Sequence, residues 1–104
     1  MPEIIWKRGA EADLLMVHAN LEDVRSGLGD RFALQLDAVL DDLRNQRAIA
    51  PNYGPPMQRL VIGNTGYGVF HTMENRRIII HALVHLSHNP ASIRVKMRRL
   101  LGWP

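Results

Sequence analysis

The chain has 104 residues, of which 46% are hydrophobic and 22% are charged, and it contains no cysteine. This length predicts one domain spanning residues 1–104, and the apolar share can build a core without staples, while the lack of cysteine excludes disulfides and thiolate metal sites. No apolar run approaches the ~20 residues of a membrane span, and the first residues lack a signal-peptide pattern. We therefore expect a cytoplasmic protein with no membrane partner. We also expect no cofactor.

The net charge of +3 is divided unevenly along the chain. Residues 1–50 hold 6 Lys and Arg against 9 Asp and Glu, whereas residues 51–104 hold 7 Lys and Arg against 1 Asp or Glu. This asymmetry predicts a basic surface built mainly by the second half, which would suit a nucleic acid or an acidic protein as partner. The alternative is that these charges only form a solvated face.

The first half predicts a strand and a helical hairpin. Residues 3–7 hold consecutive apolar residues and read as a short strand. Beyond them, apolar residues recur at spacings of three and four, which is one stripe of an α-helix, and the stripe consists of Ala10, Leu14, Val17, Leu21 and Val24. Gly27 and Gly29 end this helix, and we expect Asp30 to cap a second one. The second stripe consists of Phe32, Leu36, Val39, Leu40 and Leu43.

The stretch of residues 58–86 organises the rest of the chain. Three β-rich runs are separated by turn-like breaks at residues 63–66 and 74–76, a pattern typical of consecutive hairpins. The last run, residues 78–86, is nearly all apolar, so we expect a central strand that is covered on both faces. Proline and glycine in residues 48–56 exclude helix interior and central strand there, which leaves a crossover from the helical hairpin to the sheet.

The end of the chain predicts a final helix. Asn89 and Pro90 are a favoured N-cap and a favoured first helical residue, and we expect this helix to run to about Leu101 and to stop at Gly102. Its expected buried side consists of Ile93, Met97, Leu100 and Leu101. Helices segregated from an antiparallel run of strands predict the α+β class. The expected fold is an N-terminal strand, an α-helical hairpin on one face of an antiparallel sheet, a three-stranded antiparallel meander and a C-terminal helix.

Histidines near the end of the last strand are candidate site residues. His81 and His85 have the i, i+4 spacing of a helical zinc site, but on a strand they lie roughly 13 Å apart and cannot share a metal. We therefore predict no metal site, and we interpret His81 as a hydrogen-bonded residue of the sheet. His85 and His88 lie where a site could form, and they are weak candidates for catalysis against the commoner structural role of a lone histidine.

Basic residues supply the candidate binding surface. The final helix carries the densest cluster, which consists of Arg94, Lys96, Arg98 and Arg99. No aromatic residues are interleaved with these charges, which favours an acidic protein or a phosphate group over base reading. Arg59 is a candidate for phosphate binding and for partner binding, and a weak candidate for catalysis. The alternative is that it is a charge on an edge strand that prevents aggregation. We expect Arg76 and Arg77 to be solvated residues of a turn.

In their order and spacing, these elements resemble the RelE/ParE superfamily of toxins from bacterial toxin–antitoxin pairs over nearly the whole chain. Ala10-x-x-Asp13-Leu14 resembles the helix start of that family, and a strand holding Arg59 and Leu60 follows the crossover. Gly66-Tyr67-Gly68-Val69-Phe70 resembles its Tyr-x-Val-x-Tyr strand. The run that ends in Val84-His85-Leu86 resembles the strand of the ParE branch that ends in a histidine and a basic tail.

The resemblance implies a small toxin that a cognate antitoxin neutralises. RelE-like members cleave mRNA on the ribosome, whereas ParE-like members inhibit DNA gyrase. The RelE-type residues are poorly matched here, because Arg59 takes the first strand position while Val61 and Gly68 take two further basic positions, and His88 falls near the last. In-line cleavage of RNA needs a base, an acid and positive charge for the developing phosphorane, and this chain keeps one charge and one possible acid.

The ParE branch is therefore the favoured assignment: a growth-inhibiting toxin of a plasmid-stabilising module that binds gyrase without acting as an enzyme. Two alternatives stay open, a ribosome-dependent mRNA endonuclease of the RelE type and a degenerate, non-toxic member that only binds protein. The expected assembly is a hetero-oligomer with the antitoxin, or a homodimer. We expect an acidic antitoxin segment with apolar anchors to lie across the sheet beside the C-terminal helix, paired with Arg59, Arg94 and Arg98.

Overall fold

The computed structural model describes residues 2–46, 52–54 and 56–102. In chain order the elements are β1 (Glu3–Trp6), α1 (Arg8–Val24), α2 (Leu28–Arg44), β2 (Asn52–Gly54), β3 (Met57–Val61), β4 (Tyr67–Glu74), β5 (Arg77–His85) and α3 (Pro90–Leu101). This order confirms the predicted α+β class, with its helical hairpin, antiparallel meander and C-terminal helix. The crossover predicted for residues 48–56 falls mostly outside the described residues, and its described part includes the short strand β2.

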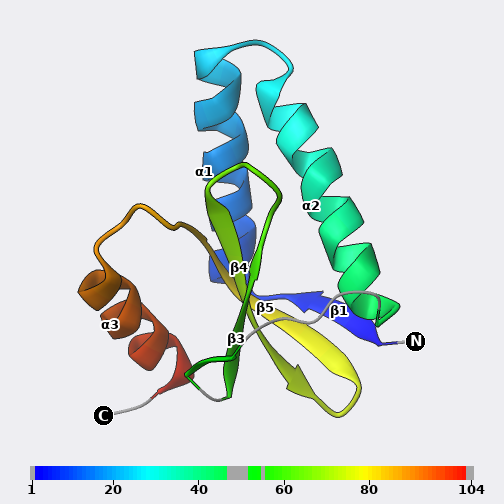
Figure 1. Ribbon diagram of the computed structural model, residues 1–104, viewed down its shortest axis with the longest axis vertical. Coiled ribbons are helices and arrows are strands. Elements are labelled where there is room, and N and C mark those ends of the chain that lie inside the picture. The colour runs from blue at the N-terminus through cyan, green and yellow to red at the C-terminus, as the bar shows by residue number, and fades with distance from the viewer. Residues whose placement is uncertain (1, 47–51, 55, 103–104) are drawn as a thin grey trace.

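The strands form one sheet in the order β1-β5-β4-β3-β2 (Figure 1). The antiparallel pairing of β3 with β4 and of β4 with β5 confirms the predicted meander. The expectation of a wholly antiparallel sheet is wrong, because β1 pairs with β5 in parallel, from Glu3 opposite Arg77 to Trp6 opposite Ile80. Parallel neighbours need a long crossover connection, and here the helical hairpin and the rest of the sheet lie between the two strands in the chain.

Two apolar clusters cover opposite faces of the sheet. One cluster joins α1 and α2 to the sheet and includes Val69, and the other joins α3 to the sheet and includes Phe70. Adjacent residues of a strand point to opposite faces, so the hairpin and α3 lie on different sides. Each residue from 78 to 84 is less than a tenth exposed, which confirms that this strand is central and covered on both faces.

A β-bulge in β5 decides which residues reach which cluster. Phe70 lies opposite Ala82 whereas His71 lies opposite Ile80, so His81 is an extra residue in β5. The extra residue interrupts the alternation of side chains, as bulges do. As a result, Ile80 packs in the hairpin cluster while Ala82 packs in the α3 cluster, although two residues apart on a regular strand would share a face.

The turn between α1 and α2 is stabilised by a residue of α1. α2 begins at Leu28, and its N-cap is Gly27 in the left-handed conformation at φ 89°. The Glu22 carboxylate accepts hydrogen bonds from the backbone N–H of Gly27 at 3.1 Å and of Gly29 at 2.6 Å, which are donors that a helix start otherwise leaves free. The prediction that Asp30 caps this helix is wrong, because the helix starts before Asp30, and its carboxylate instead bonds His18 Nε2 at 2.8 Å.

The C-terminal helix begins and ends as its sequence predicts. The Asn89 side chain accepts a hydrogen bond from the N–H of Ala91, Pro90 is the first helical residue, and Gly102 follows the helix at φ 72°. Ile93 and Met97 are buried, but Leu100 is 38% exposed, so its expected place on the buried side is wrong. Within the described ranges, no helix has the length and apolar character needed to cross a membrane.

We expect Glu22→Gln to destabilise the protein at neutral pH. Hydrogen bonds from Gly27 and Gly29 hold the pKa of the Glu22 carboxyl below its usual value of 4.5. A lowered pKa means that this contribution to stability is present above the unfolded value and is lost as pH falls through the folded one. Urea unfolding should therefore separate wild type from variant at neutral pH and show the two converging well below pH 4.5. The control is Asp23→Asn, which removes an exposed carboxylate from the same helix. It should not reproduce this pH-dependent difference.

We expect Arg76→Gly to stabilise the protein. The two-residue β4–β5 turn consists of Asn75 at φ 48° and Arg76 at φ 65°, the type I′ geometry in which glycine is favoured at the second position. Relief of the left-handed strain of an arginine should raise the free energy of unfolding by about 1 kcal/mol. Arg76→Ala removes the same charge without relieving the backbone, so an equal gain in both variants would contradict this explanation.

Candidate functional site

A groove of about 350 Å³ lies between α1, the C-terminal end of β5 and α3. Three residues predicted from the sequence as site candidates line it: His85, His88 and Lys96. Its floor is apolar, and Asp13 and Tyr67 add polar groups to its wall. A concave site with an apolar floor and a few convergent polar groups is typical of binding sites, so this groove is the candidate site.

Asp13 holds the three walls of the groove together. Its carboxylate oxygen Oδ2 accepts a hydrogen bond from the backbone N–H of Leu83 at 3.0 Å and lies 3.7 Å from the Lys96 ammonium. The pairing of β1 with β5 ends at Ile80, so Leu83 lies past the point where β1 can accept its N–H. The helix-start aspartate thus satisfies a backbone donor of β5 and neutralises the one cation that α3 directs into the groove among the described residues.

His85 is packed as a structural residue. Its Nδ1 accepts hydrogen bonds from the Ser87 hydroxyl at 2.6 Å and from the Ser87 N–H at 3.2 Å, contacts that place the ring proton on Nε2. The ring meets the Tyr67 ring edge-on with centroids 4.8 Å apart. On its other side it covers Gly66, where an added Cβ would lie 2.9 Å from Nε2. Ser87 therefore engages Nδ1, whereas Nε2 has no hydrogen-bond partner among the described residues.

His88 is the more accessible histidine of the groove. Its side chain is exposed, and its ring centroid lies 6.2 Å from that of His85. The weak catalytic candidates His85 and His88 are thus neighbours, but their rings do not share a hydrogen bond.

Two further histidines are interior residues. His81 Nε2 bonds the Thr72 hydroxyl at 2.8 Å, which confirms the interpretation of His81 as a hydrogen-bonded residue of the sheet. His71 is fully buried, and neither of its ring nitrogens has a hydrogen-bond partner among the described residues. Burial lowers the pKa of both histidines, because the charged ring would lose its hydration.

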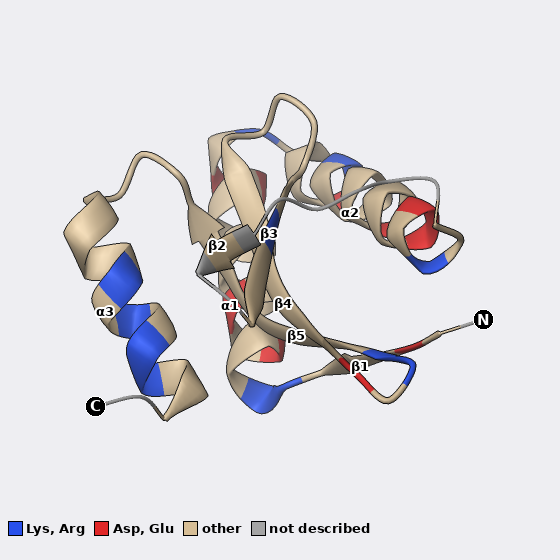
Figure 2. Ribbon diagram, turned by 60° about the horizontal axis from the view of Figure 1, so that its bottom comes forward, with Lys and Arg blue, Asp and Glu red and all other residues tan. Residues whose placement is uncertain are grey.

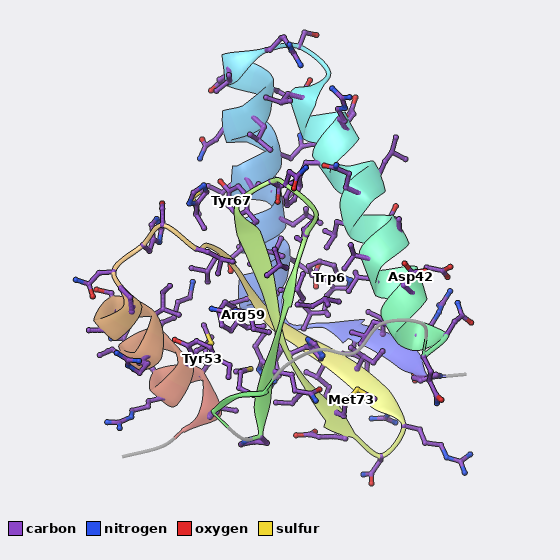
Figure 3. All side chains as sticks on the ribbon, in the orientation of Figure 1. Trp6, Asp42, Tyr53, Arg59, Tyr67 and Met73 are labelled. Atoms are coloured by element: carbon purple, nitrogen blue, oxygen red, sulfur yellow. The ribbon has the colours of Figure 1, made fainter. Side chains whose placement is uncertain are left out.

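Arg59 lies apart from the histidines. It sits in the middle of β3, and its guanidinium lies over the ring of Tyr53 at 5.6 Å from the centroid, a cation–π contact. Figure 3 shows Arg59 and Tyr53 toward α3 and Tyr67 at the start of β4, and Arg59 is not among the residues that line the groove with His85 and His88. The structure therefore does not bring the three weak catalytic candidates Arg59, His85 and His88 into one site.

Lys96 differs from the other basic residues of α3 in its surroundings. Lys96 enters the groove, whereas Arg94, Arg98 and Arg99 are exposed and form no ion pair with the described part of the chain. Figure 2 shows Lys and Arg following one another along α3. Unpaired exposed arginines on one helix form a positive surface that an acidic partner can meet.

One cluster of possible metal ligands was missed from the sequence. Atoms of His18, Glu22 and Asp30 lie within 4.8 Å of one another. The i, i+4 spacing of His18 and Glu22 could have indicated that they share a helix face. Glu22 is occupied by backbone N–H groups and His18 by Asp30, so these side chains serve to close the helical hairpin.

Neither a protein-family model nor a curated protein matches the sequence. Among solved structures, the chain is similar to a chain described as "Chromosomal ParDE TA system from P. aeruginosa". The match has a TM-score of 0.70 and 18% sequence identity, and it covers 83% of this chain and 97% of the other. At this identity the likeness shows that the two chains share a fold.

Proposed function

We propose that residues 1–104 form a single toxin domain of a bacterial toxin–antitoxin module, neutralised by a cognate antitoxin and acting by binding in the cytoplasm. The observation that carries the proposal is the shared fold with a chain of a ParDE TA system over nearly all of that chain. The order of sequence motifs that resembles the RelE/ParE superfamily supports it independently. DNA gyrase is the proposed target, because the resemblance favours the ParE branch.

The geometry of the candidate site favours binding over RNA cleavage. In-line attack by a ribose hydroxyl needs a base, an acid and positive charge around one phosphate. Arg59 is held over Tyr53, and His85 packs against Ser87 and Gly66, so the two side chains do not converge on one phosphate position. Gly68, where RelE-like members would have a basic residue, is covered by Leu86, whose Cδ2 would lie 3.0 Å from an added Cβ. A side chain at that position would therefore require Leu86 to shift by a few tenths of an ångström.

The second candidate function is the ribosome-dependent mRNA endonuclease of the RelE type. The exposed His88 beside the groove, together with the positive surface of α3, favours it. The third candidate function is that of a degenerate, non-toxic member that only binds protein. Like the gyrase-binding toxin, it would contact the antitoxin.

The antitoxin contact is assigned to α3 and the sheet beside it. Arg94, Arg98 and Arg99 supply exposed charge, while Val95 is 55% exposed on the same helix. An acidic segment with apolar anchors would neutralise these arginines and cover the apolar surface at once. Arg59 and Lys96 belong to this surface as secondary contacts, because each already has a partner within the chain.

Controlled expression in bacteria tests the class of function. We expect growth arrest with a DNA-damage response and intact mRNA, and co-expression of the antitoxin from the neighbouring open reading frame should restore growth. Cleavage of mRNA at ribosome-bound codons would contradict gyrase binding as the mode of action and favour the endonuclease function. Absence of toxicity from the soluble protein would leave the protein-binding reading and contradict the toxin assignment.

The Arg94→Glu, Arg98→Glu double variant tests the placement of the antitoxin. Because long-range steering is screened over ~8–10 Å, association with the cognate antitoxin should fall steeply with salt in the wild type. The double variant should associate more slowly and show a flatter salt dependence, with a smaller change in dissociation rate. Arg25→Glu combined with Arg76→Glu makes the same change in net charge away from α3 and is the control. An unchanged association rate in the α3 variant would place the antitoxin elsewhere, for example on the acidic helical hairpin.

A further inference from the structure

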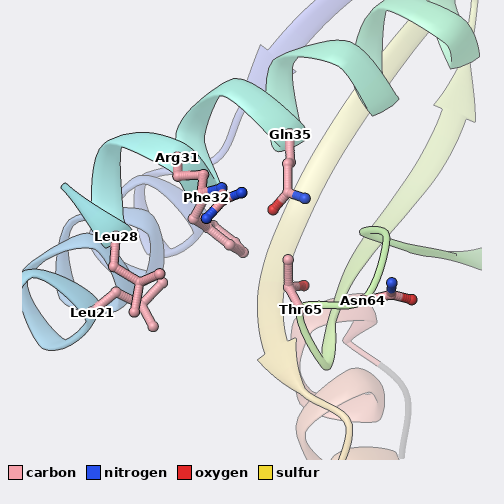
Figure 4. Close-up of a pocket in the computed structure, with 7 residues that line it drawn as sticks. All are labelled: Leu21, Leu28, Arg31, Phe32, Gln35, Asn64 and Thr65. Carbon is pink, nitrogen blue, oxygen red and sulfur yellow. The ribbon is translucent and has the colours of Figure 1, made fainter. Parts of the chain in front are cut away.

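A second cavity, of about 400 Å³, opens between the tip of the helical hairpin and the β3–β4 turn (Figure 4). Its volume lies within the range of pockets that hold ligands. None of the residues assigned above to antitoxin or target binding lines it. Its chemistry therefore has to be explained separately.

Apolar side chains form one end of this pocket. Phe32 is 2% exposed, and its ring packs edge-on against Tyr67 with centroids 5.3 Å apart. Leu21 from α1 and Leu28 from α2 are half-buried and lie next to each other in Figure 4. An apolar group that entered here would remove its own surface and the exposed parts of Leu21 and Leu28 from water, which is favourable.

The walls of the pocket are fixed before any ligand arrives. On the helical side, the bonds from Gly27 and Gly29 to Glu22 hold the hairpin tip. On the other side, the Thr65 hydroxyl donates to the Ile62 carbonyl at 2.7 Å and accepts from the Tyr67 N–H at 3.1 Å. A preformed pocket binds without an ordering cost, which raises the affinity for a small contact area.

The polar rim carries the positive charge of Arg31, which forms no ion pair with the described residues. Arg31, Gln35 and Asn64 line the pocket, and within the described residues none of their side chains has a hydrogen-bond or ion partner. The nearby carboxylates of Asp30 and Glu22 form no ion pair with Arg31, because Asp30 bonds His18 and Glu22 bonds the hairpin amides. No acidic residue lines the cavity. A guanidinium beside two amide groups is suited to a carboxylate.

We propose that this pocket is a docking site for a segment of a partner protein in which a large apolar side chain adjoins a carboxylate. The apolar side chain enters between Leu21, Leu28 and Phe32, and the carboxylate meets Arg31 at the rim. Charge complementarity identifies the partner segment as acidic. The pocket is lined by residues near the hairpin tip and in the β3–β4 turn, and in Figure 1 α3 lies on the other side of β4 from the hairpin, so a segment docked here leaves the positive surface of α3 free.

The proposal is independent of whether the chain is a toxin, and its test uses neither antitoxin nor gyrase. The probes are three acetylated dipeptide amides: aspartyl-phenylalanine, its asparaginyl analogue, and aspartyl-alanine. Amide NMR spectra of the labelled full chain report binding residue by residue. We expect saturable shifts of Leu28 and Thr65 with the first probe and no shift of Ser92 in α3.

The order of affinities tests the chemistry. Loss of the carboxylate should weaken binding about fivefold, the effect of a surface ion pair, and loss of the phenyl ring should weaken it about tenfold or more. Arg31→Gln should remove the preference for the aspartyl over the asparaginyl probe, whereas Arg25→Gln, an exposed arginine outside the pocket, should keep it.

Three results would overturn the proposal. Absence of saturable shifts at the pocket would exclude it as a docking site. Equal affinity for the charged and neutral probes, or retained discrimination in Arg31→Gln, would exclude the acidic partner. Shifts of the same residues that depend on protein concentration without a probe would make a second copy of the chain the occupant.

Discussion

The extra residue at His81 is the feature on which both sides of the molecule depend. In a regular strand, Ile78, Ile80 and Ala82 would share one face, but the bulge sends Ala82 to the α3 side and Leu83 to the hairpin side. Ile78, Ile80 and Leu83 therefore pack in the hairpin cluster, whereas Ala82 and Val84 pack in the α3 cluster, so both clusters include residues of this one strand. Without the bulge, the residues that now seat α3 would point at the helical hairpin.

The same local geometry fixes the candidate groove. Past the end of β1, the N–H of Leu83 needs an acceptor, and a buried donor without one costs on the order of 1–3 kcal/mol. Asp13 supplies that acceptor from α1 and then attracts Lys96 from α3, so one carboxylate joins three elements. The groove is therefore a consequence of how the edge of β5 is satisfied, and its polar residues are partly committed to holding the fold.

The sequence predicted the elements well where the signal is local. Stripes at helical spacing, the Asn89–Pro90 start of α3 and the polar breaks of the meander all depend on neighbouring residues, and the structure confirms them. The bulge could not be predicted from the sequence, because a strand that is apolar on both faces has no alternation of apolar and polar residues for a bulge to interrupt. The parallel pairing of β1 and the Glu22 contact were missed because each joins residues whose proximity only the folded chain creates. For the site, His85 and His88 were correctly placed near one strand end, but nothing local showed that Arg59 would be held over Tyr53 instead.

Fold alone does not decide between a binding protein and an enzyme, because function depends on the side chains of the site. Here the polar groups nearest to a catalytic arrangement are already engaged: His85 by Ser87 and Gly66, Arg59 by Tyr53, and Lys96 by Asp13. Among the described residues, the arginines without an ion pair include those exposed on α3 and Arg31 at the hairpin pocket. Unpaired charge that lies on the surface beside apolar area suits recognition, since it can steer a partner and be neutralised by it, but it does not supply the base and acid of a reaction. This distribution of charged groups supports the proposal that the protein acts by binding.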